Sequence, residues 1–213
     1  MVKTHRNYDN DYPSVTTILG VLRKIGLENW YKINDIKFIN NAMSKGKLIG
    51  TQTHEAISHY ILTGEAKIET EYPEEVTNAL KSFILFRKEN PELTMSLSEE
   101  KLTSELYKYN GTLDAPCPPI LYDWKSTERK NKERPPIYDE AKYQTAAYIH
   151  LWNENHSNIL MDTVYIVAIA KDAIAYNIYK MKKDEIDFYF NEIFLSCLKI
   201  LNAQRRKEFA YVL

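Results

Sequence analysis

The segment Thr163–Ala170 constrains the fold more than any other, because it is an almost unbroken run of apolar residues. Apolar residues at successive positions are typical of a strand covered on both faces, whereas a strand with one wet face alternates. Helical patterns flank this run, from about Asp139 to Asn153 before it and from Asp184 after it. The sequence therefore predicts an α/β domain in which helices cover a small mixed central sheet.

The remaining patterns fill in this arrangement. Earlier helices are predicted from Ser14 or Thr16, either of which can act as N-cap, to Gly26, from about Thr51 to Leu62, and from Pro73 to Asn90. Short strands are predicted at Leu102–Tyr109, Gly111–Ala115 and Ile120–Ser126, and a last strand at Ala173–Lys180 pairs with Thr163–Ala170. We expect one domain over residues 1–213, with a helical part at about 1–92, a sheet core at about 93–182 and a terminal helix at about 184–207.

Charge and composition exclude several classes of protein. A net charge of −1 argues against a protein that coats nucleic acid by bulk attraction. Cys117 and Cys197 are too few for a disulfide framework or an iron–sulfur cluster, so we expect two reduced thiols. The apolar runs are too short to span a bilayer, and residues 1–12 have no signal or transit pattern. We therefore expect a cytoplasmic protein, in the host cytoplasm if its origin is viral, with no membrane partner.

The informative chemistry lies at Asp114 and at Asp123-Trp124-Lys125. Two residues apart on a strand, Asp123 and Lys125 leave the same face, and Asp114 on the preceding strand can sit opposite them. Burying two carboxylates is expensive unless they are paired or hold a cation, and Mg²⁺ takes one or two protein carboxylates. The alternative is an exposed Asp–Lys pair at a strand end, which spacing alone would favour.

The motifs around these residues form an ordered set that covers nearly the whole chain. It comprises Tyr12-Pro13-Ser14-Val15-Thr16-Thr17-Ile18-Leu19, Gly50-Thr51-x-x-His54, Ser98-Glu99, Gly111-Thr112-Leu113-Asp114, Asp123-Trp124-Lys125 and Gln144-x-x-x-Tyr148. Each motif is weak singly, and the set is more specific. It resembles the PD-(D/E)xK nuclease superfamily in its RecB-like exonuclease branch, and is most similar to the mitochondrial genome maintenance exonuclease and its phage and bacterial relatives.

The resemblance implies a role for each matching residue. Asp114 and Asp123 would bind Mg²⁺ or Mn²⁺ with the Trp124 carbonyl, and Lys125 would be the catalytic lysine. His54 would reach the metal, although a histidine that packs on an amphipathic helix is the alternative. Glu99 would be a further site acid, with Glu100 and Glu105 as competitors. Gln144 and Tyr148, one helical turn apart, would line the site, or would be an ordinary polar and aromatic pair at a helix edge.

The implied activity is metal-dependent hydrolysis of DNA by an exonuclease of the PD-(D/E)xK fold, on single-stranded ends, in replication, recombination or repair. The basic loop 126–136 follows the site, so Ser126, Arg129 and Lys130 are candidates for phosphate contacts, with a solvated loop as the alternative. Three other functions stay open: a DNA-binding module without catalysis, a structural or regulatory partner protein, and a structure- or sequence-specific endonuclease.

Overall fold

The structure is a computed structural model that describes residues 12–95, 99–130 and 132–210. Its helices are α1 (Val15–Leu19), α2 (Ile25–Ile33), α3 (Ile36–Thr63), α4 (Glu74–Glu89), α5 (Asp139–Asn155), α6 (Lys183–Phe188) and α7 (Leu195–Ala210), with a π-helical segment, η1 (Tyr189–Phe194), between the last two. Its strands are β1 (Glu100–Ser104), β2 (Tyr109–Leu113), β3 (Ala115–Cys117), β4 (Ile120–Thr127), β5 (Thr163–Ala170) and β6 (Tyr176–Lys182).

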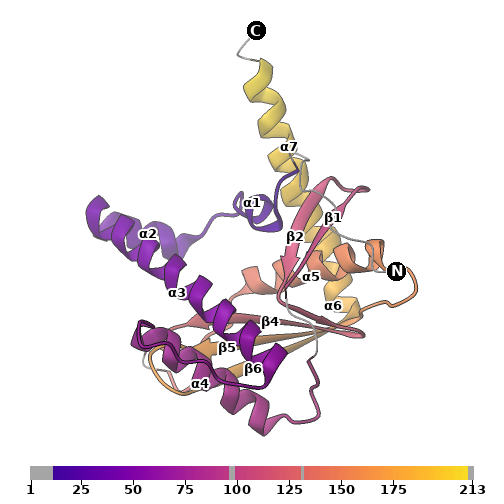
Figure 1. Ribbon diagram of the computed structural model, residues 1–213. Helices are drawn as coiled ribbons and strands as arrows, with labels where there is room; N and C mark the ends of the chain where they lie inside the picture. The colour runs from indigo at the N-terminus through magenta and orange to yellow at the C-terminus, as the bar shows by residue number, and fades with distance from the viewer. Residues whose placement is uncertain (1–11, 96–98, 131, 211–213) are drawn as a thin grey trace.

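The central sheet has the order β3-β4-β5-β6, with β4 parallel to β5 and the other neighbours antiparallel. Helices cover both of its faces, as Figure 1 shows for α4 on one side and α5 on the other. Val164 and Ile166 of β5 pack in a cluster with α5, whereas Val167 and Ile169 pack in a cluster with α3 and α4. This alternation confirms the prediction that Thr163–Ala170 is a strand covered on both faces.

The chain between 100 and 113 forms a hairpin, so the predicted single strand Leu102–Tyr109 is wrong. β1 ends at Ser104, and β2 begins at Tyr109 and pairs antiparallel with it. The carboxylate of Glu154, on α5, accepts hydrogen bonds from the backbone N–H groups of Glu105 and Leu106 in the turn. A turn held by a side chain this distant in the sequence leaves no local signal in the pattern.

The two N-terminal helix predictions need correction. The first helix ends at Leu19 instead of Gly26, because the chain turns at Gly20 and a second helix then begins at Ile25. Ser14 caps the first helix, as predicted, by accepting a hydrogen bond from the Thr17 N–H. The second predicted helix begins at Ile36 and not at Thr51.

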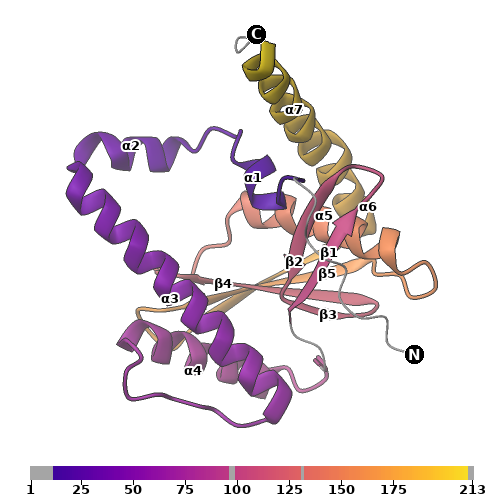
Figure 2. The same cartoon turned by 45° about the horizontal axis from the view of Figure 1, so that its top comes forward.

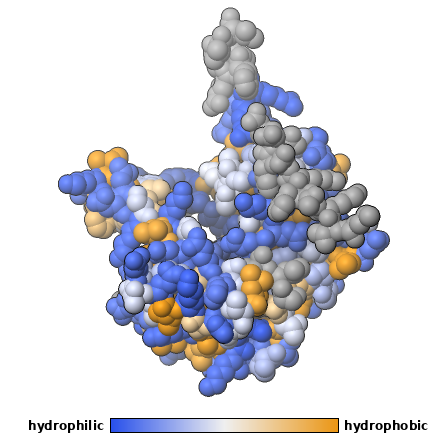
Figure 3. All heavy atoms as spheres, viewed as in Figure 1, coloured by the Kyte–Doolittle hydropathy of each residue, from blue (hydrophilic) through white to orange (hydrophobic). Residues whose placement is uncertain are grey.

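The first half of α3 escaped prediction because its apolar side chains do not form a buried stripe. Together with α2 it extends away from the sheet, as Figure 2 shows. Orange side chains lie on the surface at the outer end of this arm in Figure 3. The exposed apolar residues of α2 and of the first half of α3 are Leu27, Tyr31, Ile33, Ile36, Phe38, Met43 and Leu48. Helical periodicity in a sequence reports burial on one face, which these residues lack.

The remaining predicted elements lie close to their expected places. α4 begins one residue after Pro73, α5 begins at Asp139, and Gly64 ends α3 with the left-handed φ of 76° that glycine tolerates. The C-terminal helical stretch begins at Lys183, so Asp184 lies in its first turn and is not its N-cap. Among the described residues, no helix carries an apolar stretch long enough to cross a membrane.

Candidate active site

Asp114 lies where the chain passes from β2 to β3, and its side chain is buried. Its Oδ2 accepts a hydrogen bond of 3.1 Å from the backbone N–H of Trp124 on β4. Its Oδ1 lies 3.4 Å from Nδ1 of His54, which α3 brings to the same point. β3 pairs with β4 only as far as Tyr122, so the carboxylate of Asp114 takes the place of a missing strand partner.

Asp123 and Lys125 leave one face of β4, as their spacing predicts. Asp123 is 0% exposed, and its Oδ1 accepts a hydrogen bond of 2.9 Å from Nζ of Lys125. Its Oδ2 lies 2.8 Å from the same nitrogen, so both oxygens contact the ammonium of Lys125. Because Asp114 is buried as well, two carboxylates share this site with one ammonium, and buried charge is costly unless it is paired or holds a cation.

The two carboxyl groups differ in their electrostatics. Burial raises the pKa of Asp123 to about 6, although the ammonium of Lys125 opposes this shift. Burial acts in the same direction on Asp114, but the nearby His54 and Lys125 outweigh it and leave its pKa below the ordinary value. Burial would lower the pKa of His54, and the contact with Asp114 reverses this into a rise. The two buried carboxylates together therefore exceed the one permanent positive charge that Lys125 supplies.

These residues fit a magnesium-type ion better than a zinc-type ion. Within the part of the chain that the structure describes, no three His, Cys, Asp or Glu side chains are grouped as a ready-made metal cage. Zn²⁺ needs three or four protein ligands, whereas Mg²⁺ accepts one or two carboxylates and fills its octahedron with water and phosphate oxygens. The carboxylates of Asp114 and Asp123 meet that requirement.

The carbonyl of Trp124 also lies on the correct edge for such an ion. In a strand the N–H and C=O of one residue point to the same neighbour. Because the N–H of Trp124 donates to Asp114, its carbonyl points toward the same edge of β4. The indole ring turns away and packs between His54 and Phe83, with ring centroids 5.9 and 5.4 Å away.

His54 and Glu99 line one hollow of about 370 Å³, together with Gly50, Thr51 and Glu55. The Glu99 N–H donates to the carbonyl of Asp114 over 2.7 Å, which holds it beside the carboxylates. The two competing acids face elsewhere: Glu100 lies 3.6 Å from Nε2 of His156, and Glu105 lies 3.1 Å from Nζ of Lys108. The position of Glu99 thus favours it over both as the further site acid.

Gln144 and Tyr148 share a face of α5 near Lys125. The Gln144 amide donates a hydrogen bond of 2.7 Å to the Tyr148 hydroxyl, and Tyr148 is 5% exposed beneath Gly111. Burial raises the pKa of Tyr148, so its phenol stays protonated. The ring is packed inside the protein, and Gln144 is the member of the pair that lines a hollow.

A methyl group added at Gly111 is expected to destabilise the protein. It would lie 2.7 Å from Cε1 of Tyr148, a buried ring that cannot yield without moving Gln144. Gly111→Ala should therefore lower the free energy of unfolding by about 1–3 kcal/mol in urea denaturation. Gly46→Ala is the control, because it lies in α3 with nothing near its added methyl and should gain up to about 1 kcal/mol. Equal stability of Gly111→Ala and the wild type would contradict the packing described.

Of the three residues predicted to contact phosphate, Arg129 is already paired with another side chain. Ser126 lines a hollow next to Lys125. Arg129 is engaged with Asp172, which accepts its backbone N–H at 3.1 Å and lies 3.6 Å from its Nε. Lys130 is exposed, in a left-handed backbone conformation with φ 51°. Lys130 is therefore better placed than Arg129 to meet a phosphate.

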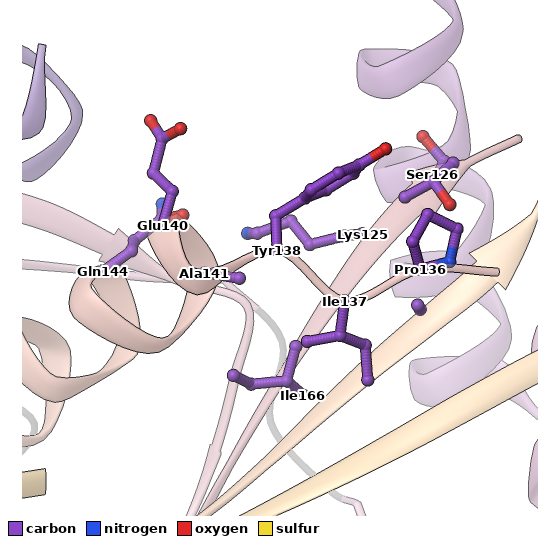
Figure 4. Close-up of a pocket in the computed structure, with 11 residues that line it drawn as sticks. Lys125, Ser126, Pro136, Ile137, Tyr138, Glu140, Ala141, Gln144 and Ile166 are labelled. Carbon is purple, nitrogen blue, oxygen red and sulfur yellow. The ribbon is translucent and has the colours of Figure 1, made fainter. Parts of the chain in front are cut away.

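Two residues of this region carried no signal in the sequence. Ile137 and Tyr138 precede α5 and line the hollow beside Lys125, which Figure 4 shows. An apolar and an aromatic residue before a helix are ordinary in any protein. Only their position in the same hollow as Lys125 of β4 distinguishes them.

Comparison with solved structures finds an exonuclease structure that shares this fold. A candidate exonuclease from Eubacterium rectale superposes with a TM-score of 0.60 at 14% identity, over 96% of this chain and 87% of the other. The two share a fold. This likeness confirms the predicted α/β fold, a small mixed sheet flanked by helices. No family model and no curated protein sequence matches the chain.

Two further exonuclease structures superpose too loosely to add to this. A phage-related exonuclease from Haemophilus somnus has a TM-score of 0.44 at 12% identity, over 94% of this chain and 97% of the other. An alkaline exonuclease from Laribacter hongkongensis has a TM-score of 0.37 at 10% identity, over 95% of each chain. The similarity to the mitochondrial branch stays a prediction.

Proposed function

We propose that the protein is a Mg²⁺- or Mn²⁺-dependent DNA exonuclease that hydrolyses phosphodiester bonds at single-stranded ends. The observation that carries this proposal is the burial of two carboxylates, Asp114 and Asp123, around one ammonium, that of Lys125. Buried charged groups destabilise a fold and therefore occur mainly at functional sites. A cation bound between these groups would offset that destabilisation. The fold shared with the E. rectale protein supports the exonuclease class.

The residues divide the chemistry among themselves. Asp114, Asp123 and the Trp124 carbonyl would hold the ion, which when bound supplies positive charge for the phosphate oxygens. Asp123 and Asp114 hold the pKa of Lys125 above its usual range despite burial, so Lys125 is an ammonium at neutral pH. That state suits it to stabilise the charge that develops on the phosphate, and not to act as a base.

The reaction is hydrolysis by water. The oxygen of water forms a bond to phosphorus, the bond from phosphorus to one ester oxygen breaks, and the leaving oxygen receives a proton. His54 and Glu99, which line the hollow next to Asp114, would orient this water. Single-stranded ends arise in replication, recombination and repair, where we place the protein and its partner proteins.

The proposal is tested by incubating the protein with end-labelled single-stranded, double-stranded and circular single-stranded DNA, each with Mg²⁺, Mn²⁺ or EDTA. We expect linear single strands to shorten from an end with either ion, and no cleavage in EDTA. Absence of cleavage with every ion would overturn the enzyme proposal and favour a binding module. Cleavage of circles would replace the exonuclease by an endonuclease.

His54→Gln is expected to lower the rate by about 10–100-fold, the usual cost of disturbing groups that hold a metal or its ligands. The fold should survive, because the His54 side chain is partly exposed and its ion pair with Asp114 is one contact of several. The measurement is the cleavage rate together with thermal unfolding. His59→Gln, on the same helix, is the matched control and should keep the rate. A His54 variant that keeps its rate but loses thermal stability would reassign His54 to packing.

A further inference from the structure

A second hollow of about 350 Å³ opens beside Lys125, between the ends of β4 and β5 and the start of α5. Figure 4 shows the Lys125 side chain behind Tyr138, with Ile137 and Ile166 below them. Lys125 lines this hollow, whereas His54 and Glu99 line the other one. The proposed site of phosphate hydrolysis therefore has a separate space on each side.

The lining of this second hollow suits a flat, largely neutral group. Its apolar lining comprises Pro136, Ile137, Ala141, Ile166 and Ala168. Lys125 brings a positive charge to this lining. The carboxylate of Glu140 lines the space and lies 2.6 Å from Nζ of Lys24. An anion is therefore favoured only next to Lys125, and a neutral apolar group is favoured elsewhere.

Tyr138 occupies the N-cap position of α5, but its side chain makes no capping hydrogen bond. The residue is 53% exposed. An exposed aromatic ring next to apolar side chains is an arrangement on which nucleobases stack, and each stacked base contributes about 1–3 kcal/mol to binding. The volume is at the small end of ligand pockets, which span roughly 300–1,000 Å³. It suits one nucleoside and is too small for two stacked nucleotides.

We propose that this hollow binds the single nucleoside adjoining the scissile phosphate, with its base stacked on Tyr138 and its phosphate next to Lys125. This rests on the proposed nuclease function and specifies its substrate. A base held between Tyr138 and Ile166 cannot remain paired with a complementary strand. The protein therefore acts on an unpaired end, and a duplex end must first open.

The test compares a natural single-stranded end with an end whose terminal nucleotide is abasic but keeps its phosphate, cleaved by the wild type, Tyr138→Ala and Tyr138→Phe. We expect the abasic end to raise KM by about tenfold for the wild type, as loss of one stacked base predicts. Tyr138→Ala should raise KM similarly on the natural end, with kcat little changed, and should no longer distinguish the two ends. Tyr138→Phe should behave as the wild type, because it keeps the ring.

Two controls separate the possible outcomes. Phe188→Ala removes an exposed aromatic ring on α6, outside the hollow, and should leave KM unchanged. Calorimetry in EDTA measures the affinity of the hollow for thymidine monophosphate in the absence of catalysis. This affinity should be weaker in Tyr138→Ala. If the wild type cleaves both ends with equal KM, the nucleoside site is overturned while the nuclease stands. If nothing is cleaved yet the nucleotide binds through Tyr138, the proposed function fails and the binding site stands.

Discussion

Asp123→Asn is expected to abolish cleavage while the protein still folds. The substitution keeps the shape of the side chain but removes the charge that would hold the cation. We expect the rate to fall by at least about 10²–10³-fold, the loss seen when one preorganised electrostatic group is removed. The measurement is the rate of shortening of a labelled single strand in Mg²⁺. A variant that retained most of the wild-type rate would remove Asp123 from the site.

The stability of this variant follows from the sign of the pKa shift. The folded state raises the pKa of Asp123 to about 6, so between pH 4 and 6 it holds a proton that the unfolded state releases. The stabilising contribution of this carboxyl group is therefore present below about pH 4 and is lost as the pH rises through 6. Asparagine does not titrate, so the stability of the variant relative to the wild type should increase over this range.

Asp114→Asn provides the opposite control. The pKa of Asp114 is lowered in the folded state, so its carboxylate stabilises the protein at neutral pH and loses this effect on acidification. Between pH 5 and pH 8 the stability of Asp123→Asn relative to the wild type should therefore rise, whereas that of Asp114→Asn should stay constant, because the pKa of Asp114 lies below this range. Urea denaturation in EDTA at pH 5 and pH 8 measures both. The same change with pH in the two variants would contradict the difference between the carboxylates.

Lys125→Met should lose both activity and stability. It leaves Asp123 buried without its ion-pair partner, and removing one partner of a buried pair costs about 3–5 kcal/mol. We expect a smaller loss, because the Lys125 side chain is 30% exposed and Asp123 can take up a proton. Added Mg²⁺ should restore stability by replacing the lost positive charge, but the rate should stay low. The readouts are denaturation with and without Mg²⁺ and the cleavage rate.

A double variant and a surface control complete this prediction. Asp123→Asn combined with Lys125→Met removes both charges and should recover most of the stability lost in Lys125→Met alone. Lys199→Met, at an exposed position of α7, should change neither stability nor rate. If the double variant were as unstable as the single one, the loss would come from packing and not from an unpaired charge.

The parts of the fold that could be predicted from the sequence are those that local residue patterns encode. The boundaries of β5 were predicted from its apolar run, and those of α4 from Pro73 and Asn90. The turn at 105–108 and the first half of α3 could not be predicted, for different reasons. Glu154 holds the turn from a distance of about fifty residues in the chain, and the exposed residues of α3 lack a buried stripe.

In the site, too, only the features that local sequence patterns encode could be predicted. The spacing of Asp123 and Lys125 places them on one face of a strand, and the structure brings Asp114 and His54 to within 3.4 Å of each other. No pattern in the sequence could indicate that both carboxylates are buried around one lysine. Nor could it indicate that Tyr138 lines a hollow beside Lys125, since that space exists only after β5 and α5 are packed.

The position of β4 has a consequence for how the protein is made. This strand lies between β3, which precedes it in the chain, and β5, which follows it by way of α5. A nascent chain that has not yet released residues 163–170 from the ribosome has no parallel neighbour for β4 and no support for Asp123 and Lys125. A fragment that ends before Thr163 lacks the strand that supports the proposed site, and we expect it not to cleave DNA.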